Sequence, residues 1–247
     1  MTEIALIMPM AGRGSRFRVR GYPVPKPLVD LFGRPFFEWA VESVRRVLHV
    51  QEMVFVVLRE HIDLFAIDEA IRVRYPEAKI VAISDTTSGA AETAAIGLDA
   101  VQGNLPIAIN DCDHAFDGRG LEAIVAALRT DAAAAIVGFR SNNPAYSFVH
   151  FDQRGHVAGT AEKQVVSQSA IAGCYFFNCP DTYRKQFNFY RDHCPYPELF
   201  VSGLYNNLAA RGEKILYQEL LKHLPFGTPE EVDALRREDF DFLRGEI

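Results

Sequence analysis

The sequence from residue 4 to residue 17 reads IALIMPMAGRGSRF. Its first part, residues 4–8, is apolar throughout, which predicts a short strand that is buried on both faces. The chain then turns through Gly12 and Gly14, and an amphipathic helix is predicted at residues 36–48. A buried strand followed by a helix is the repeating unit of a parallel α/β sheet.

The same alternation of strands and helices continues to about residue 139. It predicts strands at residues 53–58, 79–84, 105–110 and 133–139, and helices at residues 61–75, 89–101 and 120–129. Short buried strands separated by such helices favour a sheet that is flanked by helices. We therefore expect an α/β fold with a mixed, mostly parallel sheet.

The pattern changes after residue 140. A hairpin is predicted around Gly155, and helices become more frequent toward the end of the chain. The predicted strands are residues 147–152, 156–161 and 171–177, and the predicted helices are residues 180–191, 199–211 and 230–243. No repeat, low-complexity tract or linker interrupts the chain. We expect one domain over residues 1–247, whose second half, residues 141–247, forms a lid or substrate subdomain on the same sheet.

The composition excludes several classes of protein. Apolar residues make up 49% of the chain and charged residues 23%, the balance of a globular enzyme and not of a disordered chain. The formal net charge of −6 argues against binding to nucleic acid or to an anionic membrane. The apolar runs are far shorter than the ~20 residues of a membrane-spanning helix.

The cysteines and the first residues of the chain indicate the cellular compartment. Cys112, Cys174, Cys179 and Cys194 show no Cys-x-x-Cys spacing, which favours reduced thiols over disulfides or a zinc site. Glu3 interrupts the first apolar stretch, so no secretory leader is expected. Together these features predict a cytoplasmic protein.

Gly12 and Gly14 flank a single residue directly after the first strand. Glycine lets a backbone approach a ligand closely, and the exposed amides of such a turn can cradle a phosphate. A dinucleotide fingerprint is excluded because Phe17 stands where a third glycine is needed, and the Gly-Lys-Ser/Thr of a Walker loop is absent. By itself the glycine pair also fits a simple turn at the end of a strand.

Two further segments place charges near predicted strand ends. Lys26 lies between Pro25 and Pro27, which restrict its backbone and suit a cation that faces a phosphoryl group. Asp111 and Asp113 follow the strand predicted at residues 105–110, where Mg²⁺ ligands are expected in open α/β sheets. Taken in isolation, the Lys26 segment fits a solvated lysine in a loop better than a phosphate contact. The two carboxylates fit turn-forming residues as well as they fit metal ligands.

These motifs occur in a set order that spans nearly the whole chain. The order is Gly12-x-Gly14-Ser15-Arg16, Pro25-Lys26-Pro27-Leu28, Asp113, Glu162-Lys163, Ala172-Gly173-Cys174-Tyr175 and Gly227-Thr228-Pro229-Glu230. The chain thereby resembles the nucleotidyltransferase, or sugar-phosphate pyrophosphorylase, family, which has a Rossmann-like GT-A α/β fold. The chain is most similar to a bacterial subgroup found among capsule and surface-polysaccharide genes, on the segments Met8-Pro9-Met10-Ala11-Gly12, Gly21-Tyr22 and Ser88-Gly89-Ala90-Ala91.

The resemblance implies a role for each motif. Residues 1–140 would bind a nucleoside triphosphate (NTP), with Arg16 on its departing β- and γ-phosphates, Lys26 at the reacting phosphate and Asp113 on Mg²⁺. The remaining nucleotide contacts would come from Ala11, Gly12, Gly14, Ser15, Ser88, Gly89 and Ala90. Residues 141–247 would bind the phosphorylated acceptor through Glu162 and Lys163, with Gly173 letting it lie against the sheet.

The activity implied is transfer of a nucleoside monophosphate from an NTP to a phosphorylated sugar or a similar small phosphomonoester, with release of pyrophosphate, for capsule or surface-polysaccharide precursors. The subgroup alone favours CTP. The expected partners are these two small molecules, without nucleic acid or membrane, and a homo-oligomer stays open.

The sequence also departs from the family pattern and fits two other functions. Many relatives carry a second metal-binding aspartate where this chain has Pro225, so the metal site uses one carboxylate or adds Asp111. Asp111-Cys112-Asp113 is also an Asp-x-Asp motif, which makes a GT-A glycosyltransferase a second hypothesis, although such an enzyme has no use for the glycine loop. A non-catalytic nucleotide-binding module is a third, and the number of charged site residues argues against it.

Overall fold

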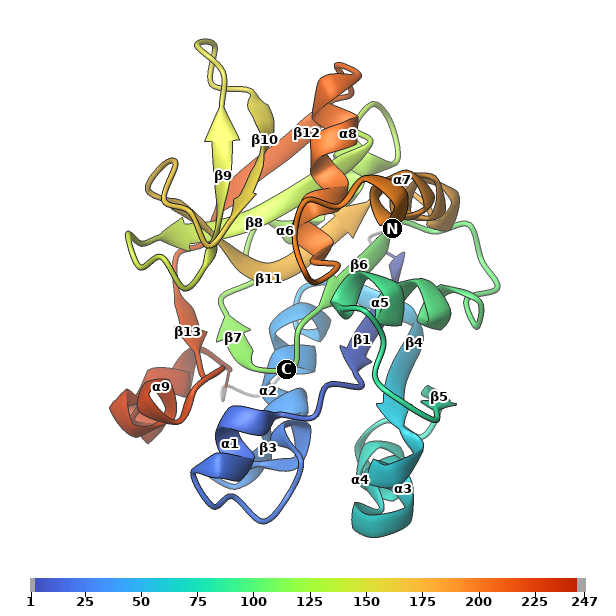
Figure 1. Cartoon of the computed structure of the whole chain (residues 1–247), viewed down its shortest axis with the longest axis vertical. Coiled ribbons are helices and arrows are strands. Elements are labelled where there is room, and N and C mark those ends of the chain that lie inside the picture. The colour runs from blue at the N-terminus through green and yellow to red at the C-terminus, as the bar shows by residue number, and fades with distance from the viewer. Residues whose placement is uncertain (1–2, 244–247) are drawn as a thin grey trace.

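The computed structural model describes residues 3–243, and its central strand is β1 (Glu3–Met10). On one side β1 pairs in parallel with β4 (His49–Leu58), which pairs in parallel with β5 (Lys79–Ile83). On the other side β1 pairs in parallel with β6 (Ile107–Asn110). The chain therefore builds outward from β1 in one direction and then returns to continue in the other (Figure 1). In open α/β sheets, ligands bind in the crevice that such a reversal creates at the carboxyl ends of the strands.

The second half of the chain extends the same sheet. β11 (Ser169–Phe177) pairs antiparallel with β6 and with β8 (Ala134–Arg140), and β8 pairs in parallel with β12 (Ile215–Glu219). The hairpin of β9 (Ser147–Phe151) and β10 (Val157–Glu162) joins the sheet beside β11. β11 is thus a reversed strand between two parallel groups, and the predicted mixed, mostly parallel α/β fold is confirmed.

Helices cover both faces of the sheet, which explains why β1 and the second half of β4 are apolar and buried. Leu6 and Met8 of β1 are fully buried on the face that holds α2 (Phe36–Arg45), and Ile7 is fully buried on the face that holds α5 (Ala90–Leu98). The first face also holds α4 (Ile67–Arg74) and α6 (Leu121–Leu128), and the second holds α7 (Pro180–His193) and α8 (Leu204–Ala210).

The segment predicted as one helix at residues 61–75 contains two helices. α3 (Arg59–Phe65) ends at Ala66, whose φ of 49° is left-handed, and α4 begins directly afterwards. A left-handed residue cannot continue a right-handed α-helix. The apolar spacing does not reveal this break, because Ile67 and Ile71 of α4 are buried in the same core as β1.

The helix predicted at residues 199–211 starts later than its apolar pattern suggests. Leu199 donates its N–H to the carbonyl of Ser88 at 2.9 Å and accepts the N–H of Ala91 at 2.9 Å. These bonds hold Leu199 outside the helix, so a 3₁₀ turn at Val201–Gly203 precedes α8. The same two bonds connect the first half of the chain to the second.

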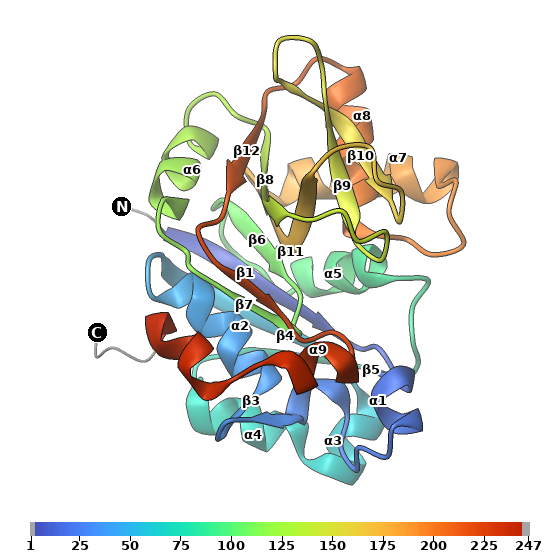
Figure 2. The same ribbon diagram turned by 90° about the vertical axis from the view of Figure 1, so that its left-hand side faces the viewer.

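A separate aromatic core joins the C-terminal segment to α2. The helix predicted at residues 230–243 ends early, as α9 (Pro229–Ala234), and a 3₁₀ turn follows at Arg237–Leu243. In that turn Phe240 is fully buried against Trp39 of α2, with ring centroids 4.4 Å apart. Figure 2 shows this segment, in red, lying across α2.

Several short elements were not predicted, because they are too short to show periodicity. They are α1 (Ser15–Val19), a 3₁₀ turn at Lys26–Leu28, the ladder of β2 (Asp30–Leu31) with β3 (Arg34–Pro35), and the ladder of β7 (His114–Phe116) with β13 (His223–Pro225). β12 was also missed. The β7–β13 ladder brings the last part of the chain beside the end of β6.

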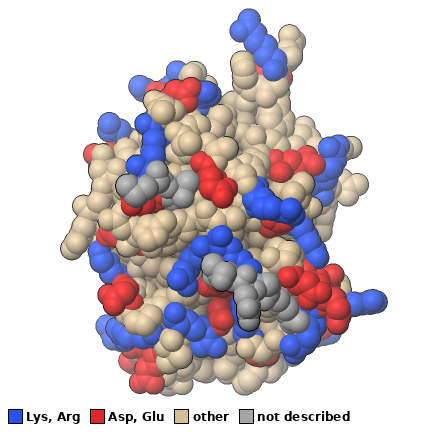
Figure 3. Space-filling view, turned by 180° about the vertical axis from the view of Figure 1, so that it is seen from behind, with Lys and Arg blue, Asp and Glu red and all other residues tan. Residues whose placement is uncertain are grey.

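The remaining global features agree with the composition. All four cysteines are free thiols, and Cys112 and Cys174 are buried. Within residues 3–243, no helix is both long and apolar enough to cross a bilayer. On the face drawn in Figure 3, basic and acidic side chains are interspersed over the described surface.

Glu52 of β4 connects three segments. Its carboxylate accepts hydrogen bonds from Lys79 Nζ at 2.6 Å and from the backbone N–H groups of Gln102 at 3.0 Å and Gly103 at 2.8 Å. Burial alone would raise the pKa of this carboxyl, but the three hydrogen bonds outweigh it and hold the pKa below its ordinary value.

We expect Glu52→Gln to lower the free energy of unfolding at pH 7 by about 1–2 kcal/mol, because hydrogen bonds to charged groups contribute more than neutral ones. A carboxyl whose pKa is lowered by folding stabilises the protein above its unfolded pKa, near 4.5, and this contribution is lost as the pH falls through the folded pKa. Urea unfolding at neutral and acid pH should therefore give a difference that shrinks in acid. Exposed Glu77→Gln is the control, and an equal difference at both pH values would contradict the assignment.

Candidate active site

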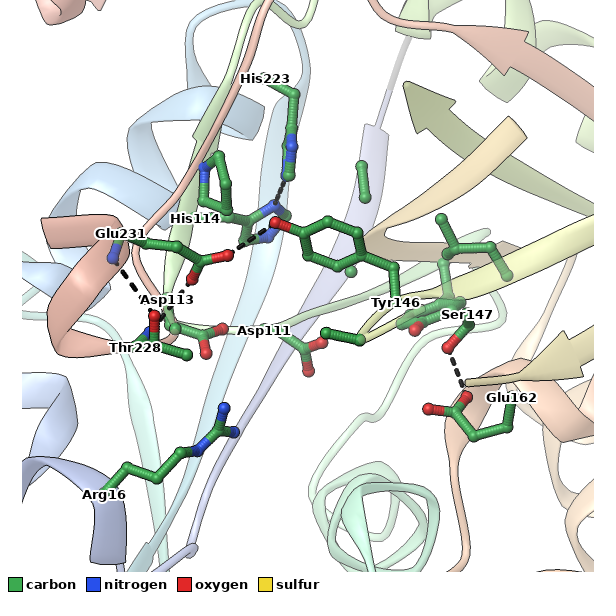
Figure 4. A pocket seen from close by; sticks show the side chains of 17 residues that line it. Arg16, Asp111, Asp113, His114, Tyr146, Ser147, Glu162, His223, Thr228 and Glu231 are labelled. Atoms are coloured by element: carbon green, nitrogen blue, oxygen red, sulfur yellow. Dashed lines mark hydrogen bonds between the residues drawn. The ribbon is translucent and has the colours of Figure 1, made fainter. Parts of the chain in front are cut away.

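Two adjoining pockets open at the carboxyl ends of β1 and β6. The first, the loop pocket, has a volume of about 430 Å³, and its lining includes Ala11, Gly12, Arg13, Lys26, Thr86, Gly89, Ala90 and Phe200. The second, the hairpin pocket, has a volume of about 200 Å³, and its lining includes Arg16, Tyr146, Ser147, Glu162, Gly173, Thr228 and Glu231 (Figure 4). Asp111 and Asp113 line both pockets, so they mark the boundary between them.

Lys26 is held against this boundary. Its Nζ lies 2.7 Å from Oδ2 of Asp113, and a Cβ added at Gly14, which has a left-handed φ of 58°, would come 3.0 Å from the Lys26 Cβ. Burial opposes the charged ammonium, but the carboxylate of Asp113 outweighs it and raises the pKa of Lys26. In return Lys26 keeps the pKa of Asp113 below its usual value in spite of burial. Both groups are therefore charged at neutral pH.

Asp111 has a different environment from Asp113. Its backbone N–H donates to the carbonyl of Gly173 at 2.9 Å, and among the described residues no cation forms a salt bridge with its carboxylate. Burial, together with the negative charge of Asp113, raises the pKa of Asp111 to about 7. Near neutral pH this carboxyl can thus gain or lose its proton easily, and a cation placed beside it would favour the charged form.

The two carboxylates fit a magnesium ion. Each faces a glycine, since a Cβ at Gly173 would lie 2.9 Å from Asp111 Oδ2 and a Cβ at Gly227 would lie 2.7 Å from Asp113 Oδ2. Within residues 3–243 there is no cluster of three or more acidic, histidine or cysteine side chains arranged to hold a metal. A pair of carboxylates is nevertheless sufficient for Mg²⁺, which takes its other ligands from phosphates and water. Pro225, which stands where many relatives carry an aspartate, lines the hairpin pocket without offering a side-chain ligand.

The predicted acceptor residues Glu162 and Lys163 face different surroundings. Glu162 lines the hairpin pocket, where its carboxylate accepts hydrogen bonds from the hydroxyls of Ser147 and Ser202. Lys163 has a left-handed φ of 53°, and its Nζ lies 5.2 Å from the ring centroid of Phe200, which lines the loop pocket. The two neighbouring side chains thus lie on different sides of the chain, Glu162 in the hairpin pocket and Lys163 beside Phe200.

The segment predicted to contact the nucleotide base is fixed to the second half of the chain. Gly89 and Ala90 line the loop pocket, whereas Ser88 does not, and its backbone is already bonded to Leu199 and to Glu92. A Cβ at Gly89 would come within 2.5 Å of the Leu199 carbonyl oxygen. Gly89 is therefore needed for close approach of two chain segments, a role that the sequence did not indicate.

The glycine loop is divided between the two pockets. Ala11 and Gly12 line the loop pocket, and Gly14 supports Lys26. Ser15 lines neither of these pockets. Arg16 is exposed on α1 and lines the hairpin pocket, although the resemblance had placed it on the triphosphate.

Further polar residues of the hairpin pocket were missed by sequence reasoning. The hydroxyl of Tyr146 donates to Glu231 Oε1 at 2.6 Å, and Oε2 of Glu231 accepts the N–H of Thr228 in the capping box of α9. Thr228 is the N-cap of α9, directly before Pro229. Nothing in the sequence connects Tyr146 with α9, because the two groups are far apart along the chain.

Two histidines complete one wall. His114 is buried, and its Nε2 lies 3.0 Å from Oδ1 of Asn110 while its Nδ1 lies 3.3 Å from Nε2 of His223. Burial lowers the pKa of His114 to about 4, so the ring is neutral at physiological pH. His114 is thus a hydrogen-bonding support for the strand end that carries Asp113.

Two polar pockets at the reversal point of an α/β sheet, joined by carboxylates and a fixed lysine, define the class of nucleotidyltransferases. The chain belongs to the family of the MobA-like NTP transferase domain, whose model matches residues 6–219. No curated protein matches its sequence.

Solved structures of three proteins share this fold. A nucleoside-diphosphate-sugar pyrophosphorylase from Vibrio cholerae RC9 is 24% identical, with a TM-score of 0.79 over 97% of this chain and 100% of that one. The inositol-1-phosphate CTP transferase from T. maritima is 15% identical, with a TM-score of 0.77 over 98% and 95%. A glucose-1-phosphate thymidylyltransferase assigned in Bacillus anthracis is 17% identical, with a TM-score of 0.75 over 99% and 100%.

We expect Gly89→Ala to destabilise the protein by about 2 kcal/mol or more, because the added methyl group would overlap the backbone of Leu199. Gly155→Ala is a matched control, since Gly155 also has a positive φ, of 80°, but a Cβ there would meet nothing within 4 Å. The control should cost only about 1 kcal/mol of backbone strain. Urea unfolding of both variants measures the difference, and equal losses would show that the approach of residues 88–91 to Leu199 is not constrained.

Proposed function

We propose that this nucleotidyltransferase transfers a nucleoside monophosphate from an NTP to a phosphorylated sugar or a similar small phosphomonoester, and that it releases pyrophosphate. The observation that carries the proposal is the placement of Lys26 and Asp113 at the boundary of two polar pockets. In the proposed complex the nucleotide occupies the loop pocket and the acceptor occupies the hairpin pocket. The reacting phosphorus then lies at the boundary.

The chemistry needs little from the protein beyond position and charge. An oxygen of the acceptor phosphate attacks the α-phosphorus in line, the bond from phosphorus to the bridging oxygen breaks, and pyrophosphate leaves. The attacking oxygen is already an anion, so no general base is required. The ammonium groups of Lys26 and Lys163 and the guanidinium of Arg16 would neutralise the charge that builds up on the phosphates.

Asp113, alone or with Asp111, would hold Mg²⁺, which when bound supplies positive charge to the phosphate oxygens. Lys26 would contribute the fixed positive charge at the same boundary. Lys26 Nζ and Asp113 Oδ2 lie 2.7 Å apart. The charged groups that would face the reacting phosphate are therefore already in place before a ligand binds. Of the other predicted nucleotide contacts, Ala11, Gly12, Gly89 and Ala90 line the loop pocket.

The acceptor pocket suits a small molecule with several hydroxyl groups. Glu162, Glu231 and Tyr146 present oxygen atoms to a pocket of about 200 Å³, and carboxylate oxygens accept hydrogen bonds from hydroxyls. The similar structures include proteins named for sugar phosphates and for inositol 1-phosphate, which supports an acceptor of this kind. CTP as the donor is supported by the CTP transferase among them and by the resemblance to the capsule subgroup. A role in capsule or surface-polysaccharide precursors is part of the same proposal.

We expect pyrophosphate to appear only when an NTP, Mg²⁺ and a phosphomonoester are all present, because each fills a separate part of the site. A coupled assay measures the pyrophosphate released from CTP, UTP, GTP, ATP or dTTP. Each nucleotide is combined with phosphorylated sugars, polyols and amino-acid derivatives, so the assay identifies both substrates. Transfer of sugar from a nucleotide sugar to an unphosphorylated acceptor would instead support a glycosyltransferase.

We expect Asp113→Asn to lower kcat/KM by about 10²-fold, as for other electrostatic catalytic groups, and to raise the Mg²⁺ requirement. Asp111→Asn should keep most of the activity, because the resemblance assigns the metal to Asp113. Activity is measured against Mg²⁺ concentration, and urea unfolding confirms that both variants fold. Equal severe losses would show that both carboxylates hold the ion, and a mild effect at Asp113 would refute its assignment.

A further inference from the structure

The loop pocket has few positive charges for the ligand proposed above. An NTP carries about four negative charges at neutral pH. Among the described residues, Arg13 and Lys26 are the cationic side chains that line this pocket. Lys26 is already paired with Asp113, and Arg16 lines the other pocket. Arg13 therefore adds a positive charge within the loop pocket itself, at its exposed rim, where the outer phosphates can meet it.

Arg13 is held at the rim of the pocket by weak ion pairs. Its Nη2 lies 2.9 Å from Oδ1 of Asp85, in the loop after β5, and its Nη1 lies 3.4 Å from Oε2 of Glu60 in α3. The side chains of Arg13, Glu60 and Asp85 are 51%, 52% and 73% exposed. Ion pairs with this exposure contribute little net stability, so they exchange easily for another partner.

A phosphate is a stronger partner for arginine than an exposed carboxylate. Its oxygens match the two parallel N–H groups of the guanidinium, and these charge-assisted bonds strengthen where water is excluded. The backbone beside Arg13 leaves room for such a ligand, because a Cβ at Gly12 would meet nothing within 4 Å. Arg13 therefore needs only to rotate its side chain to reach a group above the glycine loop.

We propose that Arg13 binds the β- and γ-phosphates of the NTP, and that Asp85 and Glu60 hold it at the rim until the nucleotide arrives. This inference rests on the proposed function of the loop pocket. It makes Asp85 a competitor of the triphosphate for the same guanidinium. Nucleotide affinity is then set partly by two surface carboxylates, Asp85 and Glu60, that do not contact the nucleotide themselves.

The test measures equilibrium binding of CTP, CMP and pyrophosphate by calorimetry, which does not depend on turnover. We expect Arg13→Gln to raise the Kd of CTP and of pyrophosphate by about tenfold or more and to leave the Kd of CMP within about twofold, because CMP lacks the outer phosphates. Arg18→Gln, which removes the same charge from exposed α1 outside the loop pocket, is the matched control and should change none of the three values by more than about twofold.

A double-mutant cycle isolates the competition. We expect Asp85→Asn to tighten CTP binding by about two- to fivefold in the wild type and to have no effect when Arg13 is already glutamine. Tightening of equal size in both backgrounds would show a general charge effect and overturn the competition. A normal Kd for CTP and pyrophosphate in Arg13→Gln would overturn the inference and leave the proposed function intact. Absence of CTP and pyrophosphate binding in the wild type would overturn both.

Discussion

The ion pair between Lys26 and Asp113 determines how the crevice is organised. Even a partly buried charge is costly unless a partner satisfies it, so each of these half-buried groups fixes the place of the other. Lys26 comes from a proline-bounded turn after β1, and Asp113 comes from the end of β6, on the two sides of the point where the sheet reverses its order. Their bond at 2.7 Å therefore sets the distance between the two loops and separates the crevice into two pockets. The glycines around it, Gly14 and Gly227, are there because no side chain fits beside the pair.

The sequence contains enough information for most of the main sheet, apart from β12, and for some of the residues that line the two pockets. Long apolar segments such as residues 53–58 predict buried strands because both of their faces are covered, and Gly12, Lys26 and Asp113 could be located because loops after parallel strands meet at one edge. The contact of Tyr146 with Glu231 could not be predicted, because it joins residues 85 positions apart without any repeating pattern. The break at Ala66 was hidden for a related reason, since the helices on both sides of it bury residues in one core.

The division of the crevice also depends on the backbone of one hairpin. Glu162 and Lys163 are adjacent at the end of β10, where Glu162 contacts Ser147, Lys163 lies near Phe200, and the backbone of Lys163 has a left-handed φ. Such a conformation costs about 1–2 kcal/mol for a residue with a side chain, so it persists only where the surrounding structure imposes it. Here the N–H of Lys163 is held by the carbonyl of Tyr146, at 3.2 Å. The hairpin that shapes one pocket thereby also places a positive charge beside the other.

The aromatic core under the C-terminal segment has an optical consequence. The chain contains a single tryptophan, Trp39, which is buried between α2 and Phe240, and its indole N–H donates to the carbonyl of Leu31 at 2.8 Å. Indole fluorescence is sensitive to water and to nearby charges, and here the Arg34 guanidinium lies 4.7 Å above the ring. Tryptophan emission from this protein therefore reports on one place, the contact of residues 237–243 with α2. Detachment of that segment would shift the spectrum to the red while the nine-stranded sheet stayed intact.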